Sequence, residues 1–566
     1  MGEPEMMRKT LLAITAAAAC AASVCVSTPA FSAGYSLVTT TESGRIQGFT
    51  KYVLGTKRRV DVYLGVPYAQ PPVGDLRFAA PKRHADWKGV RDGSIMPPAC
   101  KQASGGSEDC LYLNIYRPAG KVVPDKVPVL LYVHGGANVR GGASGVDGAR
   151  LASYSDIMVV TVQHRLGAFG FLNLPQMLHT EAGNLGILDL EEALRWLRRN
   201  IQHFGGDPEN ITLAGQSSGA TNACRMLVDK QVKGLFHGVI LQSDDCLHDV
   251  DTPDVSRARS QEFVKAVGCS GAADQLKCLR ELPADKINEA SRKLRIWNPT
   301  ASMSAVSQIA AGNWNTVPVL MGANANEGRA AARAYLDADI DQYEAWVKGL
   351  VGERNARKAL MRYPAYKYSS KYAIPYVMGD FITDSGMRGL GGCTSLALAR
   401  AFVRGKAPGL FVYEFNERNA PMKNSVPDYE TLASHGAELA YLWPDTGVRQ
   451  ELYEQFTDRQ RDLSYLMRRY WARFARAKTP NSRHLPEWPA YGKDGIVMTL
   501  SSDGSRSVPV EQLEEAHKCS FWDSIPLVMG RGDELPPKSA QEPAAQPDAG
   551  AKPSVPADAA KSVASK

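Results

Sequence analysis

The sequence has no long apolar run outside its N-terminus, no cysteine–histidine metal motif and no internal repeat. Without a C-x-x-C pair or a comparable His/Cys group, we expect no metal site, and no motif calls for a cofactor. The formal net charge of +7 is a small bias for 566 residues. Because no basic cluster with interleaved aromatic residues concentrates that charge, we expect no nucleic-acid partner.

The one sustained apolar stretch lies at the N-terminus, where Arg8 and Lys9 precede an alanine-rich run from Leu11 to about Val26. The run is too short and too alanine-rich for a transmembrane helix, and small residues follow it. Residues 1–33 therefore predict a signal peptide, a secreted or periplasmic protein, and no stable membrane insertion after signal cleavage. Lipoprotein anchoring at Cys20 is the weaker alternative, since no larger aliphatic residue stands three positions before that cysteine.

The C-terminal residues 530–566 are rich in alanine, proline and lysine and contain almost no large apolar side chain. Such a segment cannot bury a core, so it predicts a disordered tail. Residues 34–529 then remain as one folded domain.

Cysteine usage fits an exported protein. Of ten cysteines, Cys20 and Cys25 fall in the predicted signal peptide, and the even number that remains predicts disulfides. We expect disulfides to close two short loops, Cys100–Cys110 and Cys269–Cys278, and to form one longer connection, Cys393–Cys519. The two remaining cysteines, Cys224 and Cys246, either pair with each other or stay buried thiols.

Between these ends, buried-strand patterns alternate with amphipathic helical ones. Strands are predicted at 127–133, 157–162, 210–214, 238–242, 317–322 and 409–415, and helices at 188–201 and 220–227. Apolar runs alternating with helices are typical of an α/β fold with a mostly parallel sheet covered on both faces.

The most specific local motif is Gly215-Gln216-Ser217-Ser218-Gly219, which joins the predicted strand at 210–214 to the predicted helix at 220–227. A G-x-S-x-G at a strand–turn–helix junction is typical of a nucleophile elbow. The flanking glycines are needed because a Cβ there would clash with the strand or the helix. Ser217 is thus predicted to be an exposed nucleophile.

Four further segments occur in order along the chain: YLGVPYAQPPVGDLRF at 63–78, SEDCLYLNI at 107–115, GNLG at 183–186 and NIQHFGGDP at 200–208. Together with the elbow they resemble the type-B carboxylesterase and cholinesterase-like family of the α/β-hydrolases, over nearly all of residues 35–528. The resemblance implies a central, mostly parallel sheet flanked by helices on both faces, with long loop and helical insertions.

The resemblance also implies a catalytic triad. With Ser217 as nucleophile, His435 in ASHGAEL (433–439) corresponds to the base and Glu327 in GANANEG (322–328) to the acid. The other histidines late enough to follow the acid are His484, predicted to lie in a surface loop, and His517, predicted to be structural or exposed. Asp337 and Asp380 compete with Glu327 for the role of the acid.

The segment VHGGAN (133–138) follows a predicted strand and resembles the oxyanion loop of the family. The resemblance implies donors at the backbone N–H groups of Gly136 and Ala137, and the elbow adds that of Ser218. Ser243 is expected to help orient Glu327. Two ion pairs, Arg77–Glu108 and Arg165–Asp189, are implied as parts of the scaffold.

The chain departs from the family at several positions. Gln216 stands where relatives usually carry glutamate, which removes a negative charge from the pocket. The loop between Cys100 and Cys110 is short and lacks tryptophan, and both departures argue against a cholinesterase. Asp244 and Asp245 replace small residues near the expected acyl pocket. They either bind a polar or basic substrate group or face solvent, and we favour the second interpretation.

These features predict a secreted or periplasmic serine carboxylesterase that hydrolyses small-molecule esters through an acyl-enzyme, with no metal and no cofactor. A specialised hydrolase of a natural-product, toxin or polymer ester is the alternative. A non-catalytic cholinesterase-like binding protein is a weaker one, because the Ser, Glu and His residues are all present. The sequence does not predict an oligomeric state.

Overall fold

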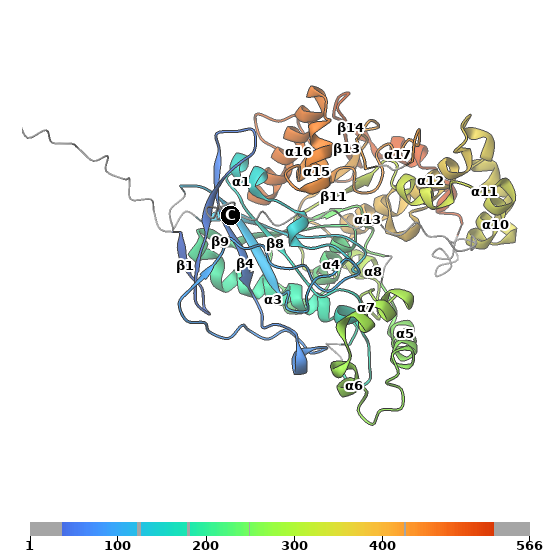
Figure 1. The fold of residues 1–566 in the computed structure, drawn as a ribbon. Helices are drawn as coiled ribbons and strands as arrows, with labels where there is room; N and C mark the ends of the chain where they lie inside the picture. Colours follow the sequence, from blue (N-terminus) through green and yellow to red (C-terminus); the bar gives the residue numbers. More distant parts are fainter. Residues whose placement is uncertain (1–36, 121–125, 178–181, 248–249, 424–425, 526–566) are drawn as a thin grey trace, which may run out of the picture. The chain divides into compact units, whose positions relative to one another are not determined.

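The computed structural model describes residues 37–120, 126–177, 182–247, 250–423 and 426–525 (Figure 1). The predicted signal peptide (1–33) and the predicted tail (530–566) lie outside them. The strands within the described residues are β1 Val38–Thr40, β2 Arg45–Gln47, β3 Phe49–Tyr52, β4 Arg59–Pro67, β5 Val90–Asp92, β6 Tyr112–Pro118, β7 Val127–Val133, β8 Met158–Val162, β9 Gly206–Gln216, β10 Gly238–Gln242, β11 Val319–Asn324, β12 Leu410–Phe415, β13 Ile496–Leu500 and β14 Arg506–Pro509.

Eleven of these strands form one sheet in the order β14-β13-β12-β11-β10-β9-β7-β8-β6-β4-β3. The pairs from β8 to β13 are parallel, and the pairs toward both edges are antiparallel. The remaining strands, β1, β2 and β5, form a small separate sheet. Because β7, β9, β10 and β11 are parallel neighbours, the loops that follow them meet at one edge, where ligands bind in such sheets.

The described helices are α1 Ala149–Ser155, α2 Gly167–Phe171, α3 Leu185–Asn200, α4 Ser218–Leu227, α5 Pro253–Ala266, α6 Gln275–Glu281, α7 Ala284–Lys293, α8 Ala305–Ala310, α9 Gly328–Ala332, α10 Ile340–Val351, α11 Glu353–Arg362, α12 Ala373–Ser385, α13 Gly392–Arg404, α14 Leu439–Leu442, α15 Gly447–Glu454, α16 Asp458–Ala477, α17 Val510–Ala516 and α18 Cys519–Trp522. Helices α5–α8 are inserted between β10 and β11, and α9–α13 between β11 and β12. These are the helical insertions that the sequence resemblance implies.

Helices cover both faces of the sheet, as the continuous apolar strands predict. In β7, Val129 and Leu131 pack into the apolar cluster that contains α3 and α4. Leu130 and Tyr132, one residue out of phase, pack into the cluster that contains α1 and α16. Successive side chains of a strand point to opposite faces, and Figure 1 shows α3 and α4 on one side of the sheet and α1 and α16 on the other.

The predicted elements are found, with shifted ends. The strand predicted at 210–214 is the middle of β9, and the helix predicted from 188 begins at Leu185. The strand predicted at 317–322 begins instead at Val319. Pro318 has no N–H to give to a ladder, although its carbonyl accepts a hydrogen bond from Val239 N at 3.0 Å.

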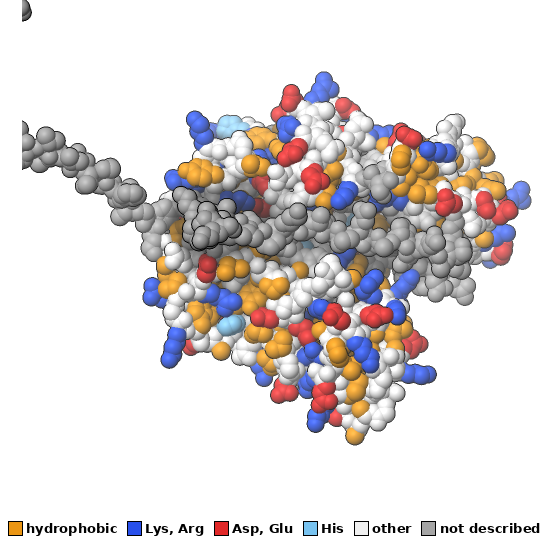
Figure 2. Space-filling view, viewed as in Figure 1, with side chains coloured by type: hydrophobic (Ala, Val, Ile, Leu, Met, Phe, Trp, Pro, Cys, Tyr) orange, Lys and Arg blue, Asp and Glu red, His pale blue; other side chains and the backbone are white. Residues whose placement is uncertain are grey.

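All eight cysteines of the described chain are in disulfides. Cys100–Cys110, Cys269–Cys278 and Cys393–Cys519 are paired as expected. The two leftover cysteines are also paired, as Cys224–Cys246. On the surface, the face in Figure 2 carries Lys and Arg side chains interspersed with Asp and Glu, which fits a mild net charge.

Candidate active site

Ser217 lies between β9 and α4 in a sharp turn, with φ 55° and ψ −133°. A non-glycine residue with positive φ is strained and persists only where its surroundings fix it. Here the Ser217 N–H donates to the carbonyl of Gln242 on β10 at 2.9 Å. A Cβ at Gly215 would strike the Gly219 carbonyl, and one at Gly219 would strike the Val133 carbonyl. The close approach of backbone explains the two glycines of the motif.

His435 and Glu327, which are 108 residues apart, lie side by side at the same edge. His435 Nδ1 donates to Glu327 Oε2 at 2.6 Å, and the His435 N–H donates to the Glu327 carbonyl at 3.3 Å. The Glu327 side chain is fully buried, whereas His435 is 26 % exposed. A bond from Nδ1–H to a carboxylate leaves Nε2 as the unprotonated acceptor, which is the state a general base requires.

The surroundings of His435 favour its charged form. Burial alone lowers the pKa of an imidazole, but the charge and hydrogen bond of Glu327, with the charges of Glu438 and Asp244, raise the pKa of His435 above 6.5. Glu438, three residues further along, is fully buried. Burial and the charge of Glu327 raise the pKa of Glu438 to about 7. Glu438 is therefore partly protonated near pH 7.

The loop after β7 places backbone N–H groups beside Ser217. A Cβ at Gly135 would lie 2.7 Å from the Gln216 carbonyl and 3.1 Å from Ser217 Cβ. Gly136 and Ala137 adopt positive φ of 121° and 54°. Within the described residues, neither of their N–H groups has a hydrogen-bond partner, and Ser218 is the first residue of α4, where an N–H has no intrahelical partner. The three predicted donors are therefore available to a ligand.

Side chains that the sequence did not single out for this purpose hold the donor loop. Ser218 Oγ accepts from the Asn138 N–H at 3.1 Å, so it ties the loop to α4. Gln102, inside the Cys100–Cys110 loop, accepts from the Gly141 N–H at 3.0 Å and donates to the Gly141 carbonyl at 2.8 Å. The short disulfide loop therefore braces the far end of the donor loop.

Two further residues that the sequence singled out near the predicted triad, Gln216 and Ser243, differ in their contacts. Gln216 is buried, and its Nε2 lies 3.4 Å from His435 Nε2. Ser243 donates its backbone N–H to the Gly322 carbonyl at 2.8 Å. Its Oγ has no hydrogen-bond partner in the described part of the chain, Glu327 included. The second oxygen of Glu327 is bound instead by the Asn324 N–H at 2.8 Å.

A buried polar network behind the histidine was missed from the sequence. Asn324 Nδ2 donates to the Ser434 carbonyl and to Glu438 Oε2, both at 2.7 Å. Gln242 Nε2 lies 3.4 Å from Glu438 Oε1, and Gln242 Oε1 accepts from Trp471 Nε1 at 3.1 Å. The available signal was a polar residue that ends each of two apolar strands, Gln242 on β10 and Asn324 on β11.

The favoured interpretation of Asp244 and Asp245, that they face solvent, is wrong. Asp244 is 5 % exposed and Asp245 1 %. The Thr221 hydroxyl donates to Asp244 Oδ2 at 2.6 Å, and Asp245 Oδ1 accepts from the Leu247 N–H at 2.9 Å. Nearby hydrogen-bond donors on α4 and in the loop make burial of these carboxylates possible.

Among the described residues, one group of side chains has a spacing suited to a metal: Cys224, Asp244 and Cys246. Cys224 and Cys246 form a disulfide, and metals bind the thiolate form of cysteine. With the disulfide formed, the Asp244 carboxylate is the only metal ligand that this group of three residues provides.

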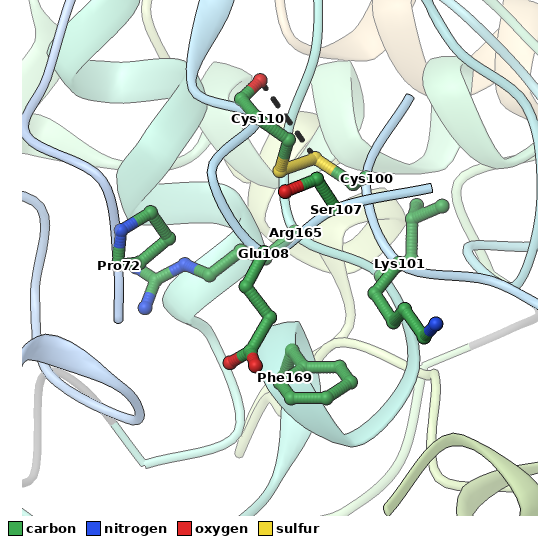
Figure 3. A pocket seen from close by; sticks show the side chains of 9 residues that line it. Pro72, Cys100, Lys101, Ser107, Glu108, Cys110, Arg165 and Phe169 are labelled. Carbon is green, nitrogen blue, oxygen red and sulfur yellow. Dashed lines mark hydrogen bonds between the residues drawn. A yellow bond between two sulfur atoms is a disulfide. The ribbon is translucent and has the colours of Figure 1, made fainter. Parts of the chain in front are cut away.

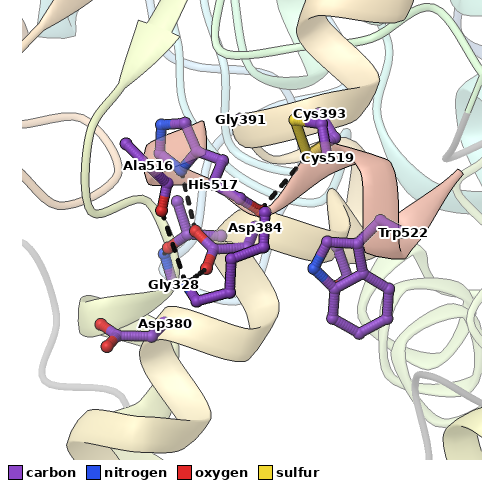
Figure 4. A network of polar contacts seen from close by, with 12 residues as sticks. Gly328, Asp380, Asp384, Gly391, Cys393, Ala516, His517, Cys519 and Trp522 are labelled. Carbon is purple, nitrogen blue, oxygen red and sulfur yellow. Dashed lines mark hydrogen bonds and ion pairs between the residues drawn. A yellow bond between two sulfur atoms is a disulfide. The ribbon is translucent and has the colours of Figure 1, made fainter. Parts of the chain in front are cut away.

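The competing residues lie in other surroundings. His484 is exposed. His517 is buried, between Asp384 Oδ1 at 2.8 Å and Glu414 Oε1 at 2.7 Å, so it is structural (Figure 4). Asp337 is exposed. The Asp380 carboxylate accepts hydrogen bonds from three side chains of the protein: Lys367 Nζ at 2.6 Å, Tyr368 OH at 2.5 Å and Arg329 Nη2 at 3.4 Å.

The two implied ion pairs are present. Arg77 binds both oxygens of Glu108 at 2.7 and 2.5 Å, and Arg165 binds both oxygens of Asp189 at 2.8 and 2.7 Å. Glu108 and Arg165 also line the hollow in Figure 3, beside the Cys100–Cys110 bridge. Its volume of about 10 Å³ has room for about one water. No predicted catalytic residue lines it, so it belongs to the scaffold.

Comparison with known proteins identifies the family of the chain. The profile of the carboxylesterase family matches residues 35–522. The cocaine esterase of Homo sapiens is 30 % identical over 530 residues, which cover 86 % of this chain and 90 % of that protein. The acylcarnitine hydrolase of Mus musculus is 32 % identical over 521 residues, covering 85 % and 90 %.

A solved structure described as a thermophylic PNB esterase superposes with a TM-score of 0.70 at 27 % identity. The match covers 86 % of this chain and 99 % of that one. Profile, relatives and structure agree over nearly the whole described chain. The chain therefore belongs to the carboxylesterase family, and it is a carboxylic ester hydrolase with the α/β-hydrolase fold.

Proposed function

We propose that this protein is an exported serine carboxylesterase that uses Ser217, His435 and Glu327 as its triad and forms an acyl-enzyme. The observation that carries the proposal is the short bond between His435 and Glu327 at 2.6 Å, located at the strand edge where the Ser217 elbow ends β9. The family assignment supports ester hydrolysis as the reaction of these residues.

In the proposed first half-reaction, Ser217 Oγ attacks the ester carbonyl carbon while His435 Nε2 takes the hydroxyl proton. Glu327 stabilises the imidazolium that results. The negative oxygen of the tetrahedral intermediate accepts hydrogen bonds from the N–H groups of Gly136, Ala137 and Ser218. Collapse breaks the bond to the alcohol oxygen, which receives the proton from His435, and the acyl group stays on Ser217.

In the second half-reaction, water attacks the acyl carbonyl and His435 Nε2 takes a proton from it. The same N–H groups stabilise the second tetrahedral intermediate, and its collapse releases the carboxylic acid and restores Ser217. Gln216, as a neutral amide, adds no charge beside the base. We therefore expect no preference for cationic alcohols of the kind that an anionic side chain at this position would favour.

Export is part of the proposal. It is supported by the predicted signal peptide and by disulfides, which form and persist in oxidising compartments. In the described part of the chain, no helix is both long and apolar enough to cross a membrane. Mass spectrometry of the protein from an exporting host should find a mature chain that begins near residue 34. A chain that retains its first residues would contradict export by signal cleavage.

The esterase activity is tested with p-nitrophenyl acetate, butyrate, octanoate and palmitate, with Ser217→Ala as the matched control. We expect turnover of the short and medium chains that disappears in the control while the circular dichroism spectrum is unchanged. Turnover confined to palmitate would indicate a lipase instead. Unchanged turnover in Ser217→Ala, or a folded protein that neither hydrolyses any ester nor reacts with a serine-directed phosphonate, would refute the proposal.

A further inference from the structure

The side-chain amide of Gln102 joins two loops. Gln102 is 6 % exposed and lies in the loop closed by the Cys100–Cys110 disulfide, whose bridge is drawn in Figure 3. Its Oε1 accepts the Gly141 N–H at 3.0 Å, and its Nε2 donates to the carbonyls of Gly141 at 2.8 Å and Cys100 at 3.0 Å. The amide therefore binds the main chain of both loops at once, with both of its N–H groups in use.

The Cys100–Cys110 loop holds Gln102 in place through its own backbone. The Gln102 N–H donates to the Gly105 carbonyl at 2.9 Å, and the Gly105 N–H donates to the Gln102 carbonyl at 3.0 Å. The chain then turns back at Gly106, where a Cβ would lie 2.6 Å from the Cys100 carbonyl oxygen. The turn and the disulfide together determine where the Gln102 amide points.

Gly141, the partner of Gln102, packs directly on the start of the donor loop. A Cβ at Gly141 would lie 2.6 Å from the Gly135 carbonyl oxygen and 2.6 Å from His134 Nδ1, so the Gly141 backbone is in contact with both. His134 Nδ1 donates to the same Gly135 carbonyl at 2.9 Å. The Gly135 carbonyl is therefore held between the His134 ring and the Gly141 backbone.

The Gly135 carbonyl belongs to the same peptide group as the Gly136 N–H. Because a trans peptide is planar, its carbonyl and its N–H point in opposite directions, and a fixed carbonyl fixes the direction of the N–H. The next peptide group is held in the same way, since the Gly136 carbonyl accepts the N–H groups of Val139 at 3.1 Å and Arg140 at 3.2 Å. These two peptide groups carry the N–H groups of Gly136 and Ala137, the proposed donors to the oxyanion.

We propose that Gln102 is a positioning residue of the oxyanion hole: it keeps Gly141 against the Gly135 peptide and so directs the Gly136 N–H toward the substrate oxygen. The proposal rests on the proposed function, in which that N–H stabilises the tetrahedral intermediate. The three side-chain hydrogen bonds of Gln102 end on main-chain atoms, so it acts through the loop. Removal of an oxyanion donor costs about 10²–10³ in kcat, and a misplacement of about 1 Å costs up to about 10².

The test uses Gln102→Met, whose side chain has a similar length but makes none of the three hydrogen bonds. With p-nitrophenyl butyrate, kcat should fall by about ten- to a hundredfold while KM stays within about twofold of the wild type. The second probe is an alkyl trifluoromethyl ketone. Ser217 Oγ adds to its carbonyl carbon, the hydroxyl proton passes to His435 Nε2, and the oxyanion that forms accepts from the same N–H groups. The inhibition constant of the ketone should rise by the same factor as kcat falls.

The matched control is Lys101→Gln, in the same loop. Lys101 Nζ binds Asp285 of α7 at 2.6 Å, so its exchange should leave kcat and the inhibition constant at their wild-type values. An equal loss in this control would show that the Cys100–Cys110 loop is needed only for folding, and would overturn the proposal.

A kcat of Gln102→Met within about twofold of the wild type would also overturn it. So would a lower kcat with an unchanged inhibition constant, because misfolding of some molecules lowers kcat without changing the affinity of the others. If Gln102→Met does not fold, Gln102→Asn provides the same test, since its amide is one methylene group too short to hold Gly141. The failure of the proposed function looks different: the wild-type protein itself would show no turnover that depends on Ser217.

Discussion

Replacing His517 with glutamine removes a buried charge far from Ser217 in the sequence. The imidazole lies between Asp384 Oδ1 at 2.8 Å and Glu414 Oε1 at 2.7 Å, and its side chain is 8 % exposed. Lys518 Nζ also binds Asp384, at 2.6 Å. Burial alone would lower the pKa of His517, but the two carboxylates outweigh it and raise that pKa from 6.5 to about 10.

This pKa shift determines how much stability the substitution removes and how that loss depends on pH. One pKa unit corresponds to about 1.4 kcal/mol, so the charged network stabilises the folded protein by at most about 5 kcal/mol. Loss of one partner from a buried ion pair typically costs about 3–5 kcal/mol, which is the same range. The folded-state pKa of His517 is the higher one, so the contribution is fully present below pH 6.5 and is lost as pH rises toward 10.

The assay is urea unfolding, followed by tryptophan fluorescence, of the wild type and His517→Gln at pH 6, 7, 8, 9 and 10. The gap in unfolding free energy should be largest at pH 6 and should narrow steadily above that pH. Lys518 and Tyr363, which also contact Asp384, are present in both proteins, so the two proteins differ only at residue 517. His484→Gln, at an exposed histidine, is the control and should show no gap. A gap for His517→Gln that is constant from pH 6 to 10 would show that His517 is not charged in the folded protein and would refute the reasoning.

Three further predictions concern the reaction. Ser218→Ala removes the acceptor of the Asn138 N–H and should lower kcat more than it raises KM, because the donor loop loses its tie to α4; an unchanged kcat would contradict this role. Glu327→Gln should lower kcat by about 10⁴ while the protein stays folded, by analogy with the corresponding change in a serine triad, and near-normal kcat would rule Glu327 out as the acid. Glu438→Gln removes a carboxyl whose charge raises the pKa of His435. Because the pKa of Glu438 is about 7, that charge is present only at and above this pH. In the variant kcat/KM should therefore reach its plateau at lower pH while the more acidic part of the profile stays in place, and a displaced acidic part would contradict this.

The limits of prediction from the sequence follow from the range of the interactions. The core strands and α4 are encoded by apolar runs and glycine spacing within a few residues, so their existence and type were predicted, although the strand predicted at 210–214 is only the middle of β9. The bond between Asn324 and Glu438 joins residues 114 positions apart, and no local pattern specifies it. The burial of Asp244 was mispredicted for the same reason: its partner Thr221 belongs to another element, and a carboxylate without a visible partner is normally exposed.

The hydrogen bonds of the backbone explain how three distant loops form one site. Beyond the ends of β9, β10 and β11 the ladder continues: the Ser217 N–H donates to the Gln242 carbonyl, the Ser243 N–H to that of Gly322, and the Ala325 N–H to that of Phe415. The following amide, that of Asn326, donates to the Ala433 carbonyl in the segment that carries His435. The His435 N–H then donates back to the Glu327 carbonyl, which closes the connection. Because these bonds use main-chain atoms, they do not depend on the side chains that we propose as catalytic. Exchange of the Ser217 hydroxyl or the Glu327 carboxylate should therefore stop the reaction and leave the positions of the loops intact.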